Sequence, residues 1–235
     1  MKEEVIELDT VDKYNKFFGV ETYHPMVTVV DLSKITQPAQ PFTINYGIYA
    51  LFLKDTLCGD ITYGRQPYDY QEGTIVCFAP GQVASIHAQE GTRPTGYGLL
   101  FHPDFIRGTQ LGHDIRNYSF FSYEAREALH LSEEERHTVI DCLHKIDTEL
   151  KRPADKHSRR LITANIGLLL DYCMRFYERQ FTTREASNKD MLLSTTKPMS
   201  EIAYSLGFQY PQHMSRMFKR VVGHSHNEYR TLQRG

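Results

Sequence analysis

Five polar side chains between residues 212 and 220 have the chemistry that nucleic-acid binding requires. They are Gln212, His213, Arg216, Lys219 and Arg220. A glutamine can form paired hydrogen bonds with adenine, and an arginine can do so with the O6 and N7 atoms of guanine. Lysine and arginine also contact phosphates, which position a protein on DNA without specifying a sequence. On a helix, all but Arg220 would face largely outward. The segment is therefore a candidate DNA-binding helix.

Two short helices joined by a turn would position these side chains. Ile202, Ala203 and Leu206 fall on one face of the first helix, where the small Ala203 lets a second helix cross closely. Gly207 suits a left-handed helix cap, and Pro211 suits the first turn of the second helix. The corner and the inner face of the second helix are apolar: Phe208, Met214, Phe218, Val221 and Val222. This is the pattern of a helix-turn-helix, which places its second helix in the major groove.

The same segment carries a family motif. Glu-Ile-Ala-x-x-x-Gly-Phe begins at Glu201, and is followed by x-Tyr-x-x-His-x-x-Arg-x-Phe-Lys-x-x-x-Gly and a later Tyr-Arg. The stretch from Met191 to Arg230 resembles the second helix-turn-helix of AraC-type (AraC/XylS) transcriptional regulators. The resemblance implies that Gln212, His213 and Arg216 read bases. It also implies DNA binding at operator half-sites, with Lys219 and Arg220 better placed for phosphates.

The motif departs from the family pattern at three points. His226 stands where the family usually has proline, and Met214 replaces an aromatic residue. Family members also carry two helix-turn-helix units, and the sequence before Met191 leaves room only for a short polar linker, so the first unit is missing. Fewer phosphate contacts weaken binding steeply. We therefore expect this chain to bind DNA weakly, or only as a dimer.

Charge is distributed unevenly along the 235 residues, although the net charge is only -2. From Ser187 onward, seven Lys and Arg stand against three Asp and Glu, a net of +4, and the rest of the chain carries -6. The net charge of -2 excludes a uniformly basic nucleic-acid binder. The basic excess after Ser187 is consistent with DNA contact confined to the C-terminal end.

Residues 1–125 have the pattern of an all-β domain. Short runs rich in β-branched and aromatic residues, such as 46–53 and 74–78, are mostly bounded by Gly, Pro or Asp. Many short strands at this spacing predict a barrel or a two-sheet jelly roll. The body also resembles the companion domain of many AraC-type members, a cupin-like barrel that senses an effector. Residues 1–26 are open to two interpretations, an arm over a pocket or an edge strand or tether.

Two helices are predicted in residues 126–181. The first starts with a capping box at Ser132 and Glu135 and carries an amphipathic stripe. The second, over about 161–177, is apolar on nearly all sides, so it is either deeply buried or paired with a partner helix. We favour a homodimerisation element over simple packing on the barrel. Residues 182–190 are polar and predict a linker, followed by the helix-turn-helix remnant at 191–235. The expected fold class is α+β.

Other chemistry is sparse. The four cysteines form no C-x-x-C pair and predict reduced core residues of a cytoplasmic protein. No secretory signal or membrane span is expected. His87 lacks the neighbours of a metal-binding cupin, and no catalytic motif is present, so we expect no metal, no cofactor and no enzyme activity. Five side chains with rings could line an effector site: Tyr46, Tyr49, Phe52, Tyr63 and His87. Each is equally consistent with packing inside the barrel, so the effector-binding residues stay unknown.

Two functions remain open. The first is an effector-responsive, DNA-binding regulator of AraC type. The second is a cupin-like small-molecule-binding protein, or a barrel enzyme, whose degenerate tail binds DNA weakly or not at all. The well-patterned recognition helix favours the first, and the missing unit favours the second.

Overall fold

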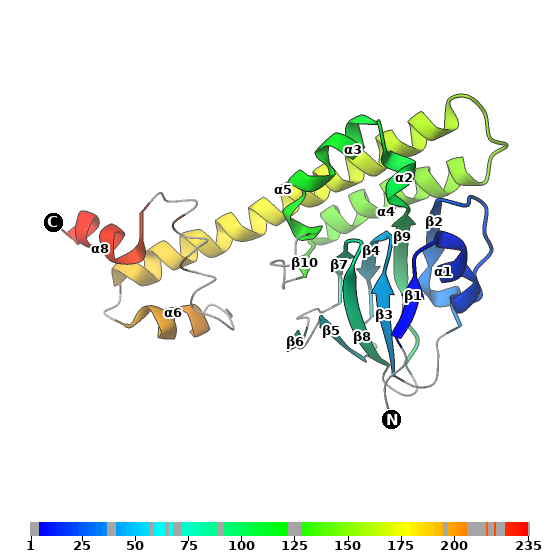
Figure 1. Cartoon of the computed structure of the whole chain (residues 1–235). Coiled ribbons are helices and arrows are strands. Elements are labelled where there is room, and N and C mark those ends of the chain that lie inside the picture. The colour runs from blue at the N-terminus through cyan, green and yellow to red at the C-terminus, as the bar shows by residue number, and fades with distance from the viewer. Residues whose placement is uncertain are drawn as a thin grey trace. The chain divides into compact units, whose positions relative to one another are not determined.

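The computed structural model divides into two compact units, residues 1–177 and 178–235 (Figure 1). It describes residues 5–36, 41–56, 59–63, 66–67, 72–88, 92–121, 128–194, 197–205, 215, 219 and 224–234. Within residues 181–194 it describes the backbone only. The two units are described separately below.

The described strands of the N-terminal unit form two five-stranded sheets. One sheet has the strand order β1 (Val5–Leu8), β3 (Phe42–Tyr46), β8 (Gln82–Ala88), β5 (Gly59–Tyr63) and β6 (Gln66–Pro67). The other has the order β10 (Leu129–His130), β7 (Thr74–Phe78), β4 (Tyr49–Lys54), β9 (Gly96–Phe101) and β2 (Val27–Asp31). β1 pairs with β3 in parallel, and the other pairings are antiparallel.

The α+β class is confirmed, but the described strands form two sheets and not one closed barrel. The apolar run 46–53, expected as one strand, splits between the sheets, because β3 ends at Tyr46 and β4 starts at Tyr49. Gly47 allows this crossing, since a Cβ there would lie 2.6 Å from the Cα of Asp9. Its N–H donates to the Leu8 carbonyl at 2.9 Å. A larger residue would push the crossing away from β1.

Aromatic side chains dominate the core between the two sheets. The Tyr46 and Phe78 rings stack with centroids 4.7 Å apart, and Tyr14 lies 6.3 Å from Phe52. Tyr14 comes from α1 (Val11–Phe18), which starts at the Thr10 cap and ends at Gly19 with φ 68. Residues 5–18 are thus an edge strand and a helix packed into this core. The edge-strand interpretation of residues 1–26 is confirmed for β1, and α1 was not predicted.

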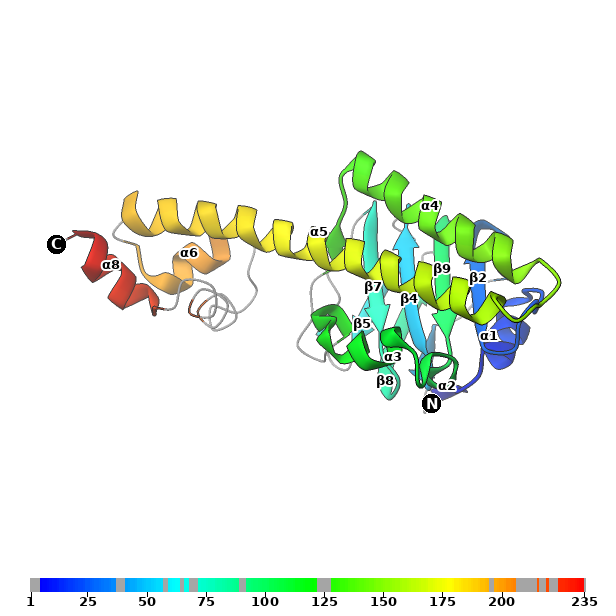
Figure 2. The same ribbon diagram turned by 90° about the horizontal axis from the view of Figure 1, so that it is seen from above.

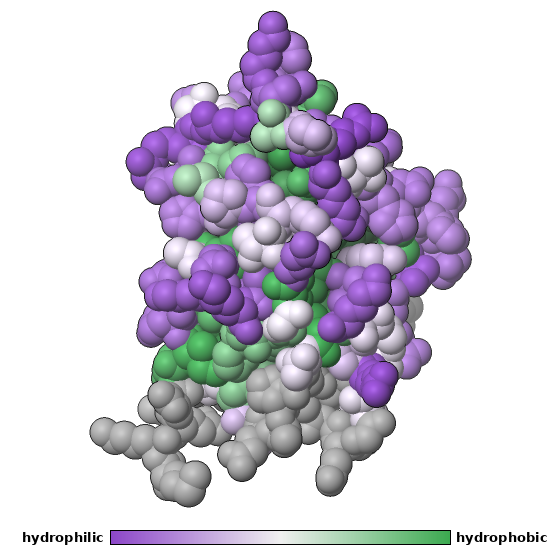
Figure 3. Space-filling model, turned by 90° about the vertical axis from the view of Figure 1, so that its right-hand side faces the viewer, coloured by the Kyte–Doolittle hydropathy of each residue, from purple (hydrophilic) through white to green (hydrophobic). Residues whose placement is uncertain are grey.

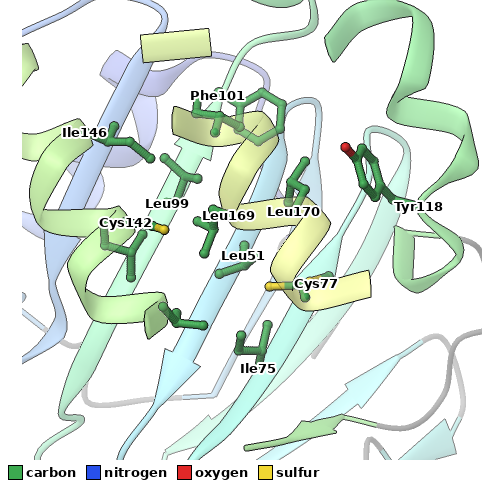
Figure 4. Close-up of a cluster of buried hydrophobic side chains, with 14 of the residues drawn as sticks. Leu51, Ile75, Cys77, Leu99, Phe101, Tyr118, Cys142, Ile146, Leu169 and Leu170 are labelled. Atoms are coloured by element: carbon green, nitrogen blue, oxygen red, sulfur yellow. The ribbon is translucent and has the colours of Figure 1, made fainter. Parts of the chain in front are cut away.

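A helical layer covers the outer face of the second sheet. Figure 2 shows α4 (Glu133–Leu150) and α5 (Ser158–Ser194) lying across β7, β4, β9 and β2. Shorter elements complete the layer and the connections: α2 (Pro103–Ile106), α3 (Gln110–Asp114) and the 3-10 turns η1 (Leu32–Lys34), η2 (Ile115–Asn117) and η3 (Ser119–Phe121). The sheet and the helices share a second apolar cluster, in which Leu51, Leu99 and Phe101 meet Ile146, Leu169 and Leu170 (Figure 4).

Cys77, Cys142 and Cys173 are free and buried in this second cluster, as the sequence predicts. Burial raises the pKa of all three thiols, that of Cys77 well above its ordinary value. They therefore act as small apolar groups at the junction of β7, α4 and α5. Cys58 lies outside the described residues.

Polar contacts fasten the helical layer to its surroundings. The predicted capping box of α4 is present, since Ser132 accepts from the Glu135 N–H and Glu135 accepts from the Ser132 N–H. Arg136 donates to both carboxylate oxygens of Asp55, at 2.8 and 2.6 Å. At the start of α5, Arg159 donates to the carbonyls of Phe105 and Arg107.

The apolar helix packs on the sheet through most of its apolar residues, including Ile162, Ile166, Leu169, Cys173 and Phe176. The packing alternative thus accounts for most of its apolar character. Leu161 and Leu168 remain 46% and 42% exposed. Figure 3 views the N-terminal unit from the side of α1 and the α4–α5 turn, and hydrophilic side chains cover most of that face.

The predicted linker at 182–190 is helical and lies inside α5. Its polar sequence without an apolar stripe predicts a linker or exposed connection. However, the segment contains no proline or glycine to stop the helix, and Arg, Glu, Ala and Lys within it favour helix. Beyond α5, the C-terminal unit contains α6 (Met199–Ser205) and α8 (His226–Arg234). No helix in the described part of the chain has the length and apolar character to cross a bilayer.

Candidate nucleic-acid interface

α6 is the predicted first helix of the helix-turn-helix. It begins at Met199, directly after Pro198, whose carbonyl accepts hydrogen bonds from the N–H groups of Glu201 and Ile202, each at 3.1 Å. Lys197 and Glu201 form an exposed ion pair at 2.9 Å. Ile202 is fully buried, which confirms its place in the core. Ala203 belongs to α6, but its side chain is outside the described residues.

Of the five predicted DNA contacts, the structure describes only Lys219. It is helical and exposed, as a phosphate contact on a recognition helix would need to be. Ser215, one turn earlier, is also helical and is half-buried. The remaining contacts lie outside the described residues: Gln212, His213, Arg216 and Arg220. The predicted corner and inner face also lie outside them: Leu206, Gly207, Phe208, Pro211, Met214, Phe218, Val221 and Val222.

α8 starts with a second capping box, which was not predicted from the sequence. The Ser225 N–H donates to Glu228 at 2.7 Å, and the Glu228 N–H donates to the Ser225 hydroxyl at 3.4 Å. These bonds, with the charges of Lys219 and His224, hold the pKa of Glu228 below its ordinary value. The Ser-x-x-Glu spacing of Ser225 and Glu228 is the sequence signal from which this capping box could have been predicted.

The capping box also explains why the departure at His226 is tolerable. His226 is the first residue of α8, a position that favours proline because its N–H has no partner within the helix. The N-cap hydroxyl and the Glu228 carboxylate define the helix start without the ring. A proline would add only a conformational restraint.

The aromatic residues considered for an effector site do not share one face. Tyr46 and Phe52 lie in the core between the sheets. Tyr49 packs on the other side of the second sheet, 5.1 Å from the rings of Phe101 and Phe121. His87 is exposed opposite Asp60 in the β5–β8 pairing, and the Tyr63 side chain is not described. Among the described residues, no three His, Cys, Asp or Glu side chains are arranged to hold a metal ion.

Comparison with protein families decides the nature of the C-terminal unit. Residues 176–232 match a family described as a helix-turn-helix domain. This segment is a helix-turn-helix domain. The match starts two residues before the compact unit that begins at Glu178. The helix-turn-helix domain therefore includes the end of α5, as well as α6 and α8.

The comparison with curated proteins found no match. Among solved structures, the chain is similar to ToxT from Vibrio cholerae. An apo variant of ToxT superposes with a TM-score of 0.34 and 12% identity, over 87% of this chain and 96% of that one. A second ToxT structure gives a TM-score of 0.30 and 11% identity, over 88% of this chain and 98% of that one. Scores this low do not establish a shared fold or function.

Proposed function

We propose that this protein is an AraC-type transcriptional regulator that binds DNA through its C-terminal helix-turn-helix. The observation that carries the proposal is the helix-turn-helix match over residues 176–232. The net charge of +4 after Ser187 supports it, because cationic side chains release counterions from DNA on binding. We assign the chain no catalytic role.

The proposed contacts divide into two groups. Arg216 pairs with guanine and Gln212 with adenine in the major groove, and His213 reads a neighbouring base edge. Lys219 and Arg220 contact phosphates and set the position of the helix. The exposure of Lys219 on a helix is compatible with this role.

We further propose that the chain acts as a homodimer through the helices of residues 132–181. In this proposal each chain carries a single helix-turn-helix unit and lacks the first unit of the family, so a monomer contacts few phosphates. Affinity falls steeply with that number, and pairing two copies restores it. Leu161 and Leu168 on α5 supply exposed apolar surface for self-association. The N-terminal unit, cupin-like in this proposal, holds a small-molecule effector.

Fluorescence anisotropy tests DNA binding directly. The labelled duplex comes from the region upstream of the protein's own gene, and a shuffled duplex of equal composition is the comparison. We expect the dimer to bind the upstream duplex more tightly than the shuffled duplex, with an affinity that falls as the salt concentration rises. The double variant Arg216→Ala with Gln212→Ala should lose that preference. Lys219→Ala should instead weaken binding to both duplexes alike, and should lower the slope of log affinity against log salt concentration by about one.

Lys145→Ala is the matched control, because Lys145 is an exposed cation on α4 in the other unit. Binding that is indifferent to salt and to the Arg216 and Gln212 changes would refute the DNA-binding proposal. It would favour the alternative of a small-molecule-binding protein with a degenerate tail. Nanomolar specific binding by a monomer at physiological salt would refute the need for a dimer.

A further inference from the structure

The turn between α4 and α5 is strongly basic, although the N-terminal unit is acidic. Residues 151–160, the basic turn, contain five Lys and Arg against one Asp, a net of +4. The other residues before Ser187 contain 15 Lys and Arg against 25 Asp and Glu, a net of -10. Every residue of the basic turn except Ser158 is exposed, on a side of the unit where hydrophilic side chains dominate (Figure 3). An exposed basic segment on an acidic body is a candidate surface for binding a polyanion.

Two cations of the basic turn fasten it to the rest of the unit. Lys151 forms an ion pair with Asp147 at 2.6 Å, and its ammonium lies 5.5 Å from the centre of the Tyr23 ring. Arg159 donates hydrogen bonds to backbone carbonyls of segment 105–107 at 2.9 to 3.1 Å. The fold itself therefore accounts for these two charges.

The backbone of the basic turn is also held in one shape. The Asp155 carboxylate accepts the N–H groups of His157 and Ser158 at 2.7 and 3.0 Å, and the Ser158 hydroxyl accepts the Asp155 N–H at 3.0 Å. The bond from the His157 N–H contributes most to holding the pKa of Asp155 below its ordinary value. The one acid of the turn is thus bonded to the start of α5. A turn that is already ordered loses little freedom when it binds a partner.

Lys156 and Arg160 have no comparable role in the fold. Both are exposed, and within the described part of the chain neither forms an ion pair. Arg160 lies in the first turn of α5, where the helix dipole disfavours a cation. That turn contains no acidic residue, whereas the first turn of α4 contains three glutamates, 133–135. Folding gives no reason for positive charge at this position, but an anionic partner would.

We propose that the basic turn binds the phosphates of duplex DNA, with Lys156 and Arg160 as its main contacts. Ammonium and guanidinium groups bind phosphates without reading bases, so the turn adds affinity and no sequence preference. Because one chain carries this surface and the helix-turn-helix, DNA held by one is at a high local concentration for the other. This inference rests on the proposed DNA-binding function and gives it a second contact surface, in the N-terminal unit.

The side chains of the basic turn favour DNA over an acidic protein as the partner. Apart from its charged residues and His157, the turn exposes only Pro153 and Ala154. The cores of protein–protein interfaces are depleted in charged residues and enriched in aromatic ones. Interfaces with DNA are more polar and much more positively charged. The composition of the turn matches the second kind of interface.

Fluorescence anisotropy of the full chain with the upstream and shuffled duplexes, over a series of salt concentrations, tests this surface. Lys156→Ala with Arg160→Ala should weaken binding to both duplexes about tenfold or more at physiological salt. It should lower the slope of log affinity against log salt concentration by about two. The ratio of the two affinities should stay within about twofold. The melting temperature should stay or rise, because the change removes a cation from the first turn of α5.

Lys34→Ala with Lys145→Ala is the matched control. It removes the same charge from exposed positions elsewhere in the N-terminal unit. This variant should leave the slope within about half a unit of the unaltered value. It separates contact with phosphates from a general loss of positive charge.

Each outcome has one meaning. If the Lys156 and Arg160 variant binds like the control while the Arg216 and Gln212 variant loses its preference, this surface is wrong and the proposed function stands. Unchanged DNA binding would leave the basic turn to an acidic protein. If the control lowers the slope equally, net charge explains the effect and the inference is overturned. If the unaltered chain binds DNA independently of salt, both proposals are overturned.

Discussion

Adjacent leucines on α5 offer a test of how the helical layer is held on the sheet. Leu169 is 0% exposed and packs in the cluster that joins α5 to β4, β7 and β9, whereas Leu168 is 42% exposed. Leu169→Ala removes buried methyl groups and leaves a cavity, so it should lower the free energy of unfolding by about 3–4 kcal/mol. Leu168→Ala leaves no enclosed cavity and should cost about 1 kcal/mol or less.

Urea denaturation followed by far-UV circular dichroism and tyrosine fluorescence measures both changes, since the chain has no Trp. For a unit of this size, Leu169→Ala should lower Tm by about 6–15 °C, and Leu168→Ala by a few degrees at most. The m-value should not change, because both variants fold to the same structure. Equal losses for the two variants, or a loss below about 1 kcal/mol for Leu169→Ala, would refute the packing of α5 on this sheet. Leu168→Ala has a second expected effect, a weaker dimer at unchanged fold.

Three further predictions concern the fold. Arg136→Ala should lower the free energy of unfolding by about 1–3 kcal/mol, because it leaves the mostly buried Asp55 carboxylate without its two charged hydrogen bonds; loss below 0.5 kcal/mol in urea titrations would contradict this. Ser225→Ala should destabilise the C-terminal unit by about 1 kcal/mol through loss of the α8 cap, measured as faster amide exchange in α8, and unchanged exchange would disprove it. Burial raises the pKa of the Cys77 and Cys173 thiols, so the unfolded chain loses these protons first as pH rises. The stability they contribute is complete below the unfolded thiol pKa of about 8.5 and falls above it, so unfolding midpoints should decline from pH 8 to 10, and a constant midpoint would count against buried thiols.

Local patterns made the helical parts predictable. The capping box at Ser132 and the amphipathic stripe of α4 depend on residues three and four apart, so the sequence alone revealed them. The burial of Ile202 on α6 followed in the same way. The capping box at Ser225 carried an equally local signal and could have been predicted. The DNA contacts at Gln212, His213, Arg216, Lys219 and Arg220 stay predictions.

Other features had no local signal. Tyr46 and Tyr49 belong to one continuous apolar run, yet they pack in different clusters because the chain changes sheets between them. A run that is apolar on both faces does not show alternation, so the change of sheet cannot be located in it. Gly47 permits the crossing, but only the approach of Asp9 shows why a glycine is needed.

By itself, the sequence determined which segments form strands and helices in outline, where positive charge gathers, and which motif could bind DNA. These properties depend on residue type and short spacing, which the chain displays directly. Only the tertiary structure decided that α5 uses most of its apolar surface on the second sheet and leaves a narrow stripe bearing Leu161 and Leu168. Burial depends on neighbours that are distant in sequence. When a helix is apolar on nearly all sides, its sequence does not indicate which side will pack against the rest of its own chain.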